Sequence, residues 1–158
     1  MSGKMTKESL LQTLQAERVA WDRLLTEVGE ARMGLPVLAD GWSVADVIAH
    51  VSWYEREATG ILRERALRGS PWWALPHAQR NAHIHAQNQG RALAEILMEA
   101  EVAYAALLAA LEAVTDDDLM DATRFAEMPA SWQPWQVVAE NSYEHYRRHA
   151  QEIRAHLL

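Results

Sequence analysis

The stretch that decides the fold runs from residue 43 to residue 62 and reads SVADVIAHVSWYEREATGIL. Ser43 is followed three residues later by Asp46, the pattern of a capping box, in which both side chains bind free backbone N–H groups of the first turn. Apolar side chains then recur every three or four residues, at Val47, Ile48, Val51, Tyr54, Ala58, Ile61 and Leu62. This spacing predicts an amphipathic helix that begins after Ser43, buries one wide stripe and ends near Gly69.

Three further long segments carry the same helical period. The first follows Thr6, a candidate N-cap, and ends at Gly29; the next runs from Leu93 to Val114. The last begins at Pro134, which suits the first position of a helix, and continues to the C-terminus. The polar segment from His77 to Gln89 is also expected to be helical. Helix-favouring residues dominate and strand-like alternation is absent, so we predict an all-α fold, a four-helix bundle.

The length and composition fit one globular domain. The chain has 158 residues, of which 49% are hydrophobic and 23% are charged. We expect residues 1–5 to form a disordered tail and residues 6–158 to form a single bundle domain. No apolar run approaches the roughly 20 residues that span a bilayer, and the N-terminus lacks the apolar core of a signal peptide. We therefore expect a cytoplasmic protein with no membrane partner.

The absence of cysteine and the negative charge exclude several functional classes. Without cysteine there is no disulfide framework, no cysteine nucleophile, no iron–sulfur cluster and no thiolate zinc site. The 22 Asp and Glu residues outnumber the 15 Lys and Arg residues, which gives a net charge of −7. Surfaces that follow nucleic-acid phosphates are normally basic, so we expect no nucleic-acid partner.

Polar residues interrupt the expected inner face of the last helix. At about 100° per residue, this face carries Asn141, Ser142, His145 and His149, and we expect Arg148 to point elsewhere. Buried polar groups cost free energy unless they are paired, so the face predicts a wet cavity or a bound ion. His145 and His149 are four residues apart and can reach one metal ion, although this spacing often arises by chance.

His50 extends this pattern to a second helix, because it lies on the inner stripe of the 43–62 segment. Alone, it would most simply be a hydrogen-bonded core residue. Three inward histidines on two helices instead predict a divalent metal site, His50, His145 and His149, with Zn²⁺, Ni²⁺ or Fe²⁺ as suitable ions and positions left open for a substrate. Glu152 is a candidate to orient an imidazole. Candidate contacts to a substrate or to the ligands are Tyr54, Trp53, Asn141 and Ser142.

Tryptophan is unusually frequent, with seven residues. Four of them, Trp72, Trp73, Trp132 and Trp135, fall in or beside two connectors that we expect to be irregular, residues 70–76 and 121–133. Two interpretations are open. These side chains either plug the ends of the bundle or form an aromatic rim around a cavity that admits a flat or apolar small molecule.

Two stretches resemble motifs of the DinB/YfiT-like superfamily. Gly41-Trp-Ser-Val-Ala-Asp-Val-Ile-Ala-His50 resembles the start of its second helix, and Asn141-Ser-Tyr-Glu-His145-Tyr-Arg-Arg-His149 resembles the motif of its fourth helix. Asn81, Asn88 and the segment Leu107–Leu119 are most similar to the DfsB-like branch. The resemblance covers the chain from Thr6 to Leu157. It implies an up-down-down-up bundle with a divalent metal on His50, His145 and His149, and it makes a homodimer plausible.

The resemblance also implies a class of reaction. Superfamily members include S-transferases that use bacillithiol, mycothiol or glutathione, a maleylpyruvate isomerase, and resistance proteins that inactivate reactive metabolites. Our first hypothesis is therefore a metal-dependent enzyme that transfers a low-molecular-weight thiol, or water, to an electrophilic small molecule in detoxification. The second is a non-catalytic stress or self-resistance protein that sequesters such a molecule in the same cavity. A third is a structural bundle that dimerises through its Trp-rich ends and binds no metal.

Overall fold

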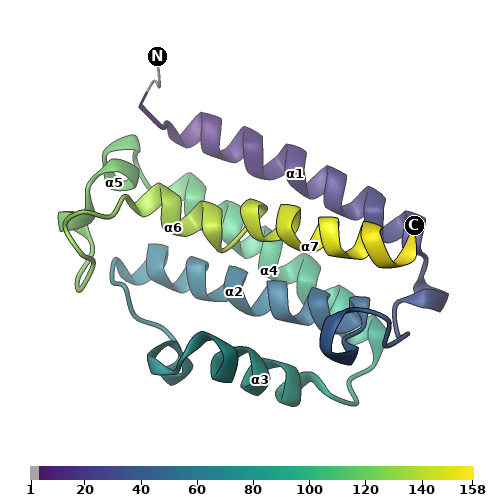
Figure 1. Ribbon diagram of the computed structural model, residues 1–158. Helices are drawn as coiled ribbons and strands as arrows, with labels where there is room; N and C mark the ends of the chain where they lie inside the picture. Colours follow the sequence, from purple (N-terminus) through teal and green to yellow (C-terminus); the bar gives the residue numbers. More distant parts are fainter. Residues whose placement is uncertain (1–3) are drawn as a thin grey trace.

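Four long helical segments form a bundle in the computed structural model, which describes residues 4–158 (Figure 1). They are α1 (Lys7–Val28), α2 (Val44–Glu64), α4 (Leu93–Ala113) and the consecutive pair α6 (Pro134–Glu140) and α7 (Tyr143–Leu157). Figure 1 shows that α1 and the α6–α7 pair run in one direction while α2 and α4 run in the other. No described residue belongs to a β-strand. The expected all-α, up-down-down-up four-helix bundle is confirmed.

Shorter elements connect the long helices. Because α2 and α4 are parallel, the chain must return between them, and α3 (His77–Asn88) makes this return along the side of α2 (Figure 1). The remaining elements are η1 (Glu30–Arg32), η2 (Ala39–Gly41), η3 (Pro71–Ala74), α5 (Asp116–Met120) and η4 (Ala122–Arg124). Of the expected disordered tail, residues 1–3 lie outside the described part of the chain, and Met5 packs against the core.

The predicted helix starts have the expected hydrogen bonds. The Thr6 hydroxyl accepts a hydrogen bond from the backbone N–H of Ser9. At α2, the Ser43 hydroxyl accepts from the N–H of Asp46, and the Asp46 carboxylate accepts from the N–H of Ser43. The apolar stripes behind these caps form one main core between the four long helices. Within residues 4–158, no helix is long and apolar enough to cross a membrane.

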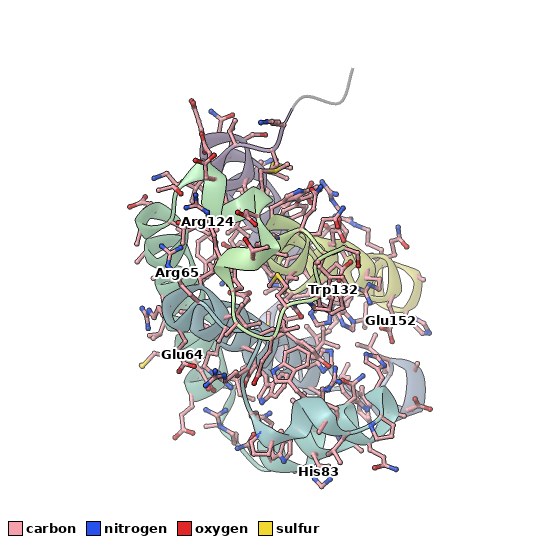
Figure 2. All side chains as sticks on the ribbon, turned by 90° about the vertical axis from the view of Figure 1, so that its left-hand side faces the viewer. Glu64, Arg65, His83, Arg124, Trp132 and Glu152 are labelled. Atoms are coloured by element: carbon pink, nitrogen blue, oxygen red, sulfur yellow. The ribbon has the colours of Figure 1, made fainter. Side chains whose placement is uncertain are left out.

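The expected end of α2 near Gly69 is wrong. The helix ends at Glu64, because Arg65 adopts the left-handed conformation with φ 50° and ψ 49°. The chain then pairs with the loop before α6: the N–H of Leu67 donates to the carbonyl of Ala126 at 2.8 Å. Arg65 also pairs with the buried carboxylate of Asp118, and Figure 2 shows Arg65 and Arg124 near each other at this end of the bundle.

Gly69 does not end a helix. It lacks a side chain at a position where the Glu57 carboxylate comes very close to the backbone. The Glu57 carboxylate lies so near that a Cβ on residue 69 would meet its Oε2 at 1.8 Å. That oxygen accepts hydrogen bonds from the N–H of Ser70 at 3.0 Å and from the indole N–H of Trp73 at 2.7 Å. One carboxylate of α2 therefore fixes the position of the connector and of the Trp73 ring.

The sequence predicts one continuous last helix, and this prediction is wrong. The helix is broken at Asn141 and Ser142. The Asn141 amide donates to the carbonyl of Val137 at 2.7 Å, and the Ser142 hydroxyl donates to that of Val138 at 2.6 Å. Such side chains compete with backbone N–H groups for carbonyls four residues earlier and bend helices. Ser142 accordingly has φ −137° and ψ −101°, outside the helical range. His145 therefore lies in the first turn of a new helix, α7.

A buried polar network joins α1, α2 and α7 inside the core. The Tyr146 hydroxyl donates to Oε1 of Glu55 at 2.6 Å, and Nη1 of Arg18 donates to the Tyr146 hydroxyl at 3.2 Å. The Arg18 guanidinium lies 3.6 Å from the same Glu55 oxygen. Glu55 is only 1% exposed, and its Oε2 has no hydrogen-bond partner among the described residues. Burial raises the pKa of Glu55 to about 7, an effect that Arg18 and Tyr146 oppose.

We predict that Glu55 makes folding less favourable as pH rises. Its folded pKa of about 7 exceeds the ordinary value of 4.5, so between these limits the folded chain holds a proton that the unfolded chain has released. Glu55→Gln removes this proton uptake. The unfolding free energy of Glu55→Gln relative to the parent should therefore increase from about pH 5 to about pH 8. Denaturant unfolding of the two metal-free proteins at both pH values measures the difference.

The matched control for this experiment is Glu101→Gln, which removes a surface carboxylate from the same Arg18. Water screens such an exposed pair, so this variant should keep the pH dependence of the parent. A constant difference between Glu55→Gln and the parent would contradict the prediction, because Glu55 would then be ionised in the folded chain throughout the range.

Candidate metal centre and adjoining cavity

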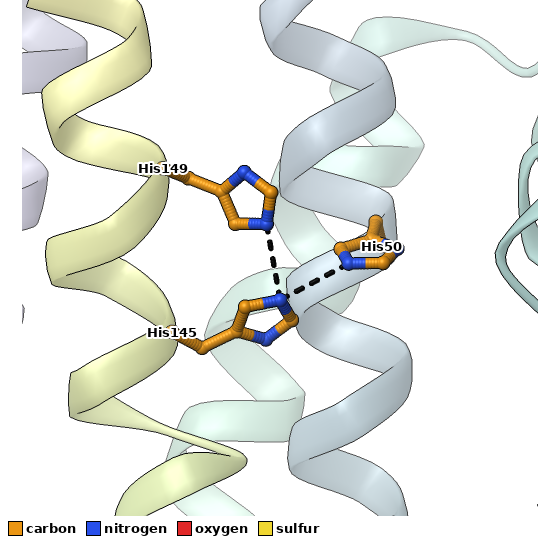
Figure 3. A group of neighbouring side chains, drawn as sticks. All are labelled: His50, His145 and His149. Carbon is orange, nitrogen blue, oxygen red and sulfur yellow. Dashed lines mark hydrogen bonds between the residues drawn. The ribbon is translucent and has the colours of Figure 1, made fainter. Parts of the chain in front are cut away.

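The structure brings His50, His145 and His149 together between α2 and α7 (Figure 3). The Nε2 atom of His145 lies 3.0 Å from Nε2 of His50 and 3.0 Å from Nε2 of His149. One ligand atom from each ring lies within 4.8 Å of the other two. Zinc binds imidazole nitrogens at roughly 2.0–2.1 Å, which in a tetrahedral site places the nitrogens roughly 3.3 Å apart. The three histidines could therefore hold one metal ion.

Hydrogen bonding alone does not satisfy this cluster. His50 is 4% exposed and His145 is 6% exposed, and their Nδ1 atoms have no partner among the described residues. A neutral imidazole has one N–H and one lone pair. If the three rings only bonded one another, each arrangement of protons would leave a buried nitrogen unpaired, at a cost of about 1–3 kcal/mol each. A shared cation would instead accept all three Nε2 lone pairs, which hydrogen bonds among the three rings cannot all pair, and only the Nδ1–H groups of His50 and His145 would then remain without a partner among the described residues. The residues present therefore fit a metal ion.

Burial also keeps the imidazoles neutral. Burial, together with the neighbouring imidazoles and Arg148, lowers the pKa of His50 to about 3 and that of His145 to about 2. Burial lowers the pKa of His149 as well, although Glu152 opposes this shift. Because only the neutral ring offers a lone pair, the environment prepares all three side chains as ligands at neutral pH.

Neighbouring side chains fix the orientation of the rings. Oε2 of Glu152, a candidate to orient an imidazole, lies 3.5 Å from Nδ1 of His149. Metal-binding histidines commonly donate their second N–H to such a group. Trp42 packs edge-on against His50, with ring centroids 5.4 Å apart. Tyr54 packs edge-on against both His50 and His145, each at 5.0 Å.

A cavity of about 500 Å³ adjoins the histidines, within the range of small-molecule sites. It lies between α2, η3, α3, α6 and α7, and His145 forms part of its wall. The aromatic side chains in the wall are Tyr54, Trp73 and Trp132. Trp132 belongs to the connector that leads into α6, at the end of the bundle that faces the viewer in Figure 2. The connectors thus supply an aromatic rim to a cavity that reaches the histidine cluster.

Two of the four candidate contact residues line this cavity. They are Tyr54, whose hydroxyl donates to Oδ1 of Asn81 at 2.8 Å, and Asn141. The other two do not. Trp53 packs against Tyr54, Trp72 and Ile84 in a second small core, and the buried Ser142 hydroxyl bonds to the helix backbone. Among the Trp residues, therefore, some rim the cavity and others fill the space under α3.

Sequence reasoning missed the charged residues of the cavity wall. Arg148, expected to point elsewhere, lines the cavity, as do Arg80, Arg68 and Glu140. The position of Arg148 could have been predicted from the sequence. It follows His145 by three residues, and residues three apart share a helix face. No comparable signal marks Arg80, since its place depends on the path of the connector before α3.

The bundle resembles a solved structure whose function is not known. It is similar to the crystal structure of an uncharacterised protein from Escherichia coli UTI89, with a TM-score of 0.78 and 14% identity. The similarity covers 95% of this chain and 91% of that chain. At this identity the likeness establishes the fold alone. No protein of curated function matches the chain.

A family model covers nearly the whole bundle. The model of the mycothiol maleylpyruvate isomerase N-terminal domain matches residues 14–157. This range contains α2 and α7 with all three clustered histidines, and most of α1. The match agrees with the superfamily that the two His motifs resemble. The chain belongs to the mycothiol maleylpyruvate isomerase N-terminal domain family, a DinB/YfiT-like all-helical family.

Proposed function

We propose that this protein is a metal-dependent enzyme that transfers a low-molecular-weight thiol, or water, to an electrophilic small molecule bound in the cavity. The observation that carries the proposal is the position of His145, which belongs both to the three-histidine cluster and to the cavity wall. A metal site that serves only the fold is normally closed by four protein ligands, whereas three ligands beside a cavity leave room for a reactant.

Each residue around the site has a definable role. His50, His145 and His149 would hold the ion, and Glu152 would keep the His149 ring in place. When bound, a divalent ion supplies a Lewis acid that lowers the pKa of a thiol or a water at neutral pH. Asn141 donates one of its two amide N–H groups to Val137, and its Oδ1 can accept a hydrogen bond from a reactant.

Several finer points belong to the same proposal. Zn²⁺, Ni²⁺ and Fe²⁺ all suit three imidazole ligands. A thiol cosubstrate suits a cytoplasmic protein, because that compartment keeps thiols reduced. The DfsB-like branch, detoxification as the purpose, a homodimer and the lack of a nucleic-acid partner stay predictions. The second candidate function, sequestration of a toxic molecule without turnover, uses the same cavity and differs only in the number of molecules consumed.

Metal binding is the first prediction of this proposal. The purified chain should hold one divalent ion, and replacing any one of the three histidines with Gln should remove it after dialysis, because two imidazoles bind far more weakly than three. Elemental analysis measures the metal per chain. His156→Gln is the matched control, since His156 lies on the same helix, is exposed and should leave the metal content unchanged. Equal metal content in all variants would contradict the assigned ligands.

The second prediction separates a functional metal site from a structural one. His149→Ala should lower the Tm of the metal-free protein by only a few degrees, or about 1 kcal/mol for a domain of this size. The reason is that the His149 side chain is 19% exposed. Water can therefore enter the space that this ring leaves and solvate the two remaining rings. Calorimetry of the metal-free variant and parent gives this value. A fall of more than about 15 °C, or loss of cooperative unfolding, would indicate a structural site.

The third prediction concerns turnover. With metal, a low-molecular-weight thiol and a chromogenic aryl halide as electrophile, each chain should form many equivalents of thioether, while His145→Gln should form none above the uncatalysed rate. Product is counted by absorbance against the protein concentration. A reaction that stops at one equivalent per chain would favour sequestration over catalysis. The His156→Gln variant should turn over like the parent.

A further inference from the structure

The cavity beside the histidines is positively charged, although the chain as a whole is acidic. Its wall contains three arginines, Arg68, Arg80 and Arg148, and one acid, Glu140, in a chain of net charge −7. Arg68 lies 3.6 Å from the exposed carboxylate of Glu127, which offsets its charge. Within residues 4–158, Arg80 and Arg148 form no ion pair with any carboxylate. Two cationic groups therefore face the cavity without an anionic partner.

The structure holds one of these cations firmly. The Arg80 guanidinium donates to the backbone carbonyls of Trp72 and Trp73 at 3.3 and 3.0 Å, and it stacks over the Trp73 ring at 4.5 Å. Carbonyls orient a guanidinium but do not neutralise it. Arg80 and Trp73 thus present a fixed positive charge beside a flat aromatic surface, and Trp73 is itself anchored by Glu57.

The second cation lies on the side of the cavity next to the histidines. Arg148 follows His145 by three residues on α7, and both side chains line the cavity. Its charge acts on the groups around the cavity: burial raises the pKa of Tyr54, and Arg80 and Arg148 both oppose that rise. The cavity wall therefore combines two cations that form no ion pair with aromatic side chains.

We propose that the electrophilic substrate is a flat organic anion, such as an aryl carboxylate with a displaceable group on its ring, whose charged group binds Arg148 while its ring lies against the aromatic wall formed by Trp73, Trp132 and Tyr54. Guanidinium groups bind carboxylates through paired, charge-assisted hydrogen bonds. The inference rests on the proposed function, because it assigns a substrate class to the same cavity. It needs no assumption about the metal, because the arginines and aromatic residues hold the ligand.

The test compares ligands of the same shape that differ in charge. The probes are 2-naphthoate and 2-naphthamide, measured by quenching of Trp fluorescence with metal-free and with zinc-loaded protein. The carboxylate should bind more tightly than the amide in both forms. Arg148→Gln should weaken naphthoate binding about tenfold and leave naphthamide binding unchanged, as expected for loss of one charged hydrogen-bonding partner. Glu140→Gln should strengthen naphthoate binding, because it removes the acid from the cavity wall.

Arg147→Gln is the matched control. Arg147 precedes Arg148 in α7 but pairs with Glu17 of α1 at 2.8 Å, away from the cavity, so naphthoate affinity should stay that of the parent. Equal affinity for both probes, or an equal loss in both arginine variants, would overturn the proposal. So would Arg148-dependent binding of S-methylglutathione with no binding of naphthoate, because the anion would then belong to the thiol. Failure of turnover or of metal binding leaves these affinities unaffected, so the two proposals fail separately.

Discussion

The candidate site depends on how the inner faces of α2 and α7 meet, because both helices place polar side chains there, where apolar ones would normally pack. On one part of this contact His50 faces His145 and His149, and on another Glu55 accepts a hydrogen bond from Tyr146. Buried polar groups must find partners or cost free energy. For Glu55, Arg18 of α1 is one such partner. For the three imidazoles, a metal ion would be the partner.

This constraint connects the fold to the site. His50 is held on the inner stripe of a helix that the capping box at Ser43 begins, and His145 lies three residues after Ser142, in the first turn of α7. The apolar core packs the helices without help from the histidines. The three imidazoles therefore need not bond one another to hold the helices together, and one nitrogen of each can bind a shared ion. The cavity then opens beside His145, next to the connector between α2 and α3, which Glu57 fixes through the Trp73 indole. Ligands, wall and rim thus come from separate parts of the chain.

Most of the fold and the histidine cluster could be predicted from the sequence, because both follow from local periodicity. Caps such as Thr6 and Ser43 and stripes at helical spacing locate the helices, and an inward His on each of two facing helices is a pattern of the same kind. The remainder depends on tertiary contacts. Ser142 breaks a helix that periodicity alone would continue. Gly69 reflects the approach of the Glu57 carboxylate, and the cationic wall depends on where the connectors bring Arg80.

The most direct test of the central claim, that His50, His145 and His149 share one ion beside an open position, is X-ray absorption spectroscopy of the zinc-loaded protein. The account predicts a first shell with three imidazole nitrogens at about 2.0–2.1 Å, plus an oxygen that a small thiol replaces with a sulfur at about 2.3 Å. A shell that thiol addition leaves unchanged, or one with fewer than three imidazoles, would contradict the account.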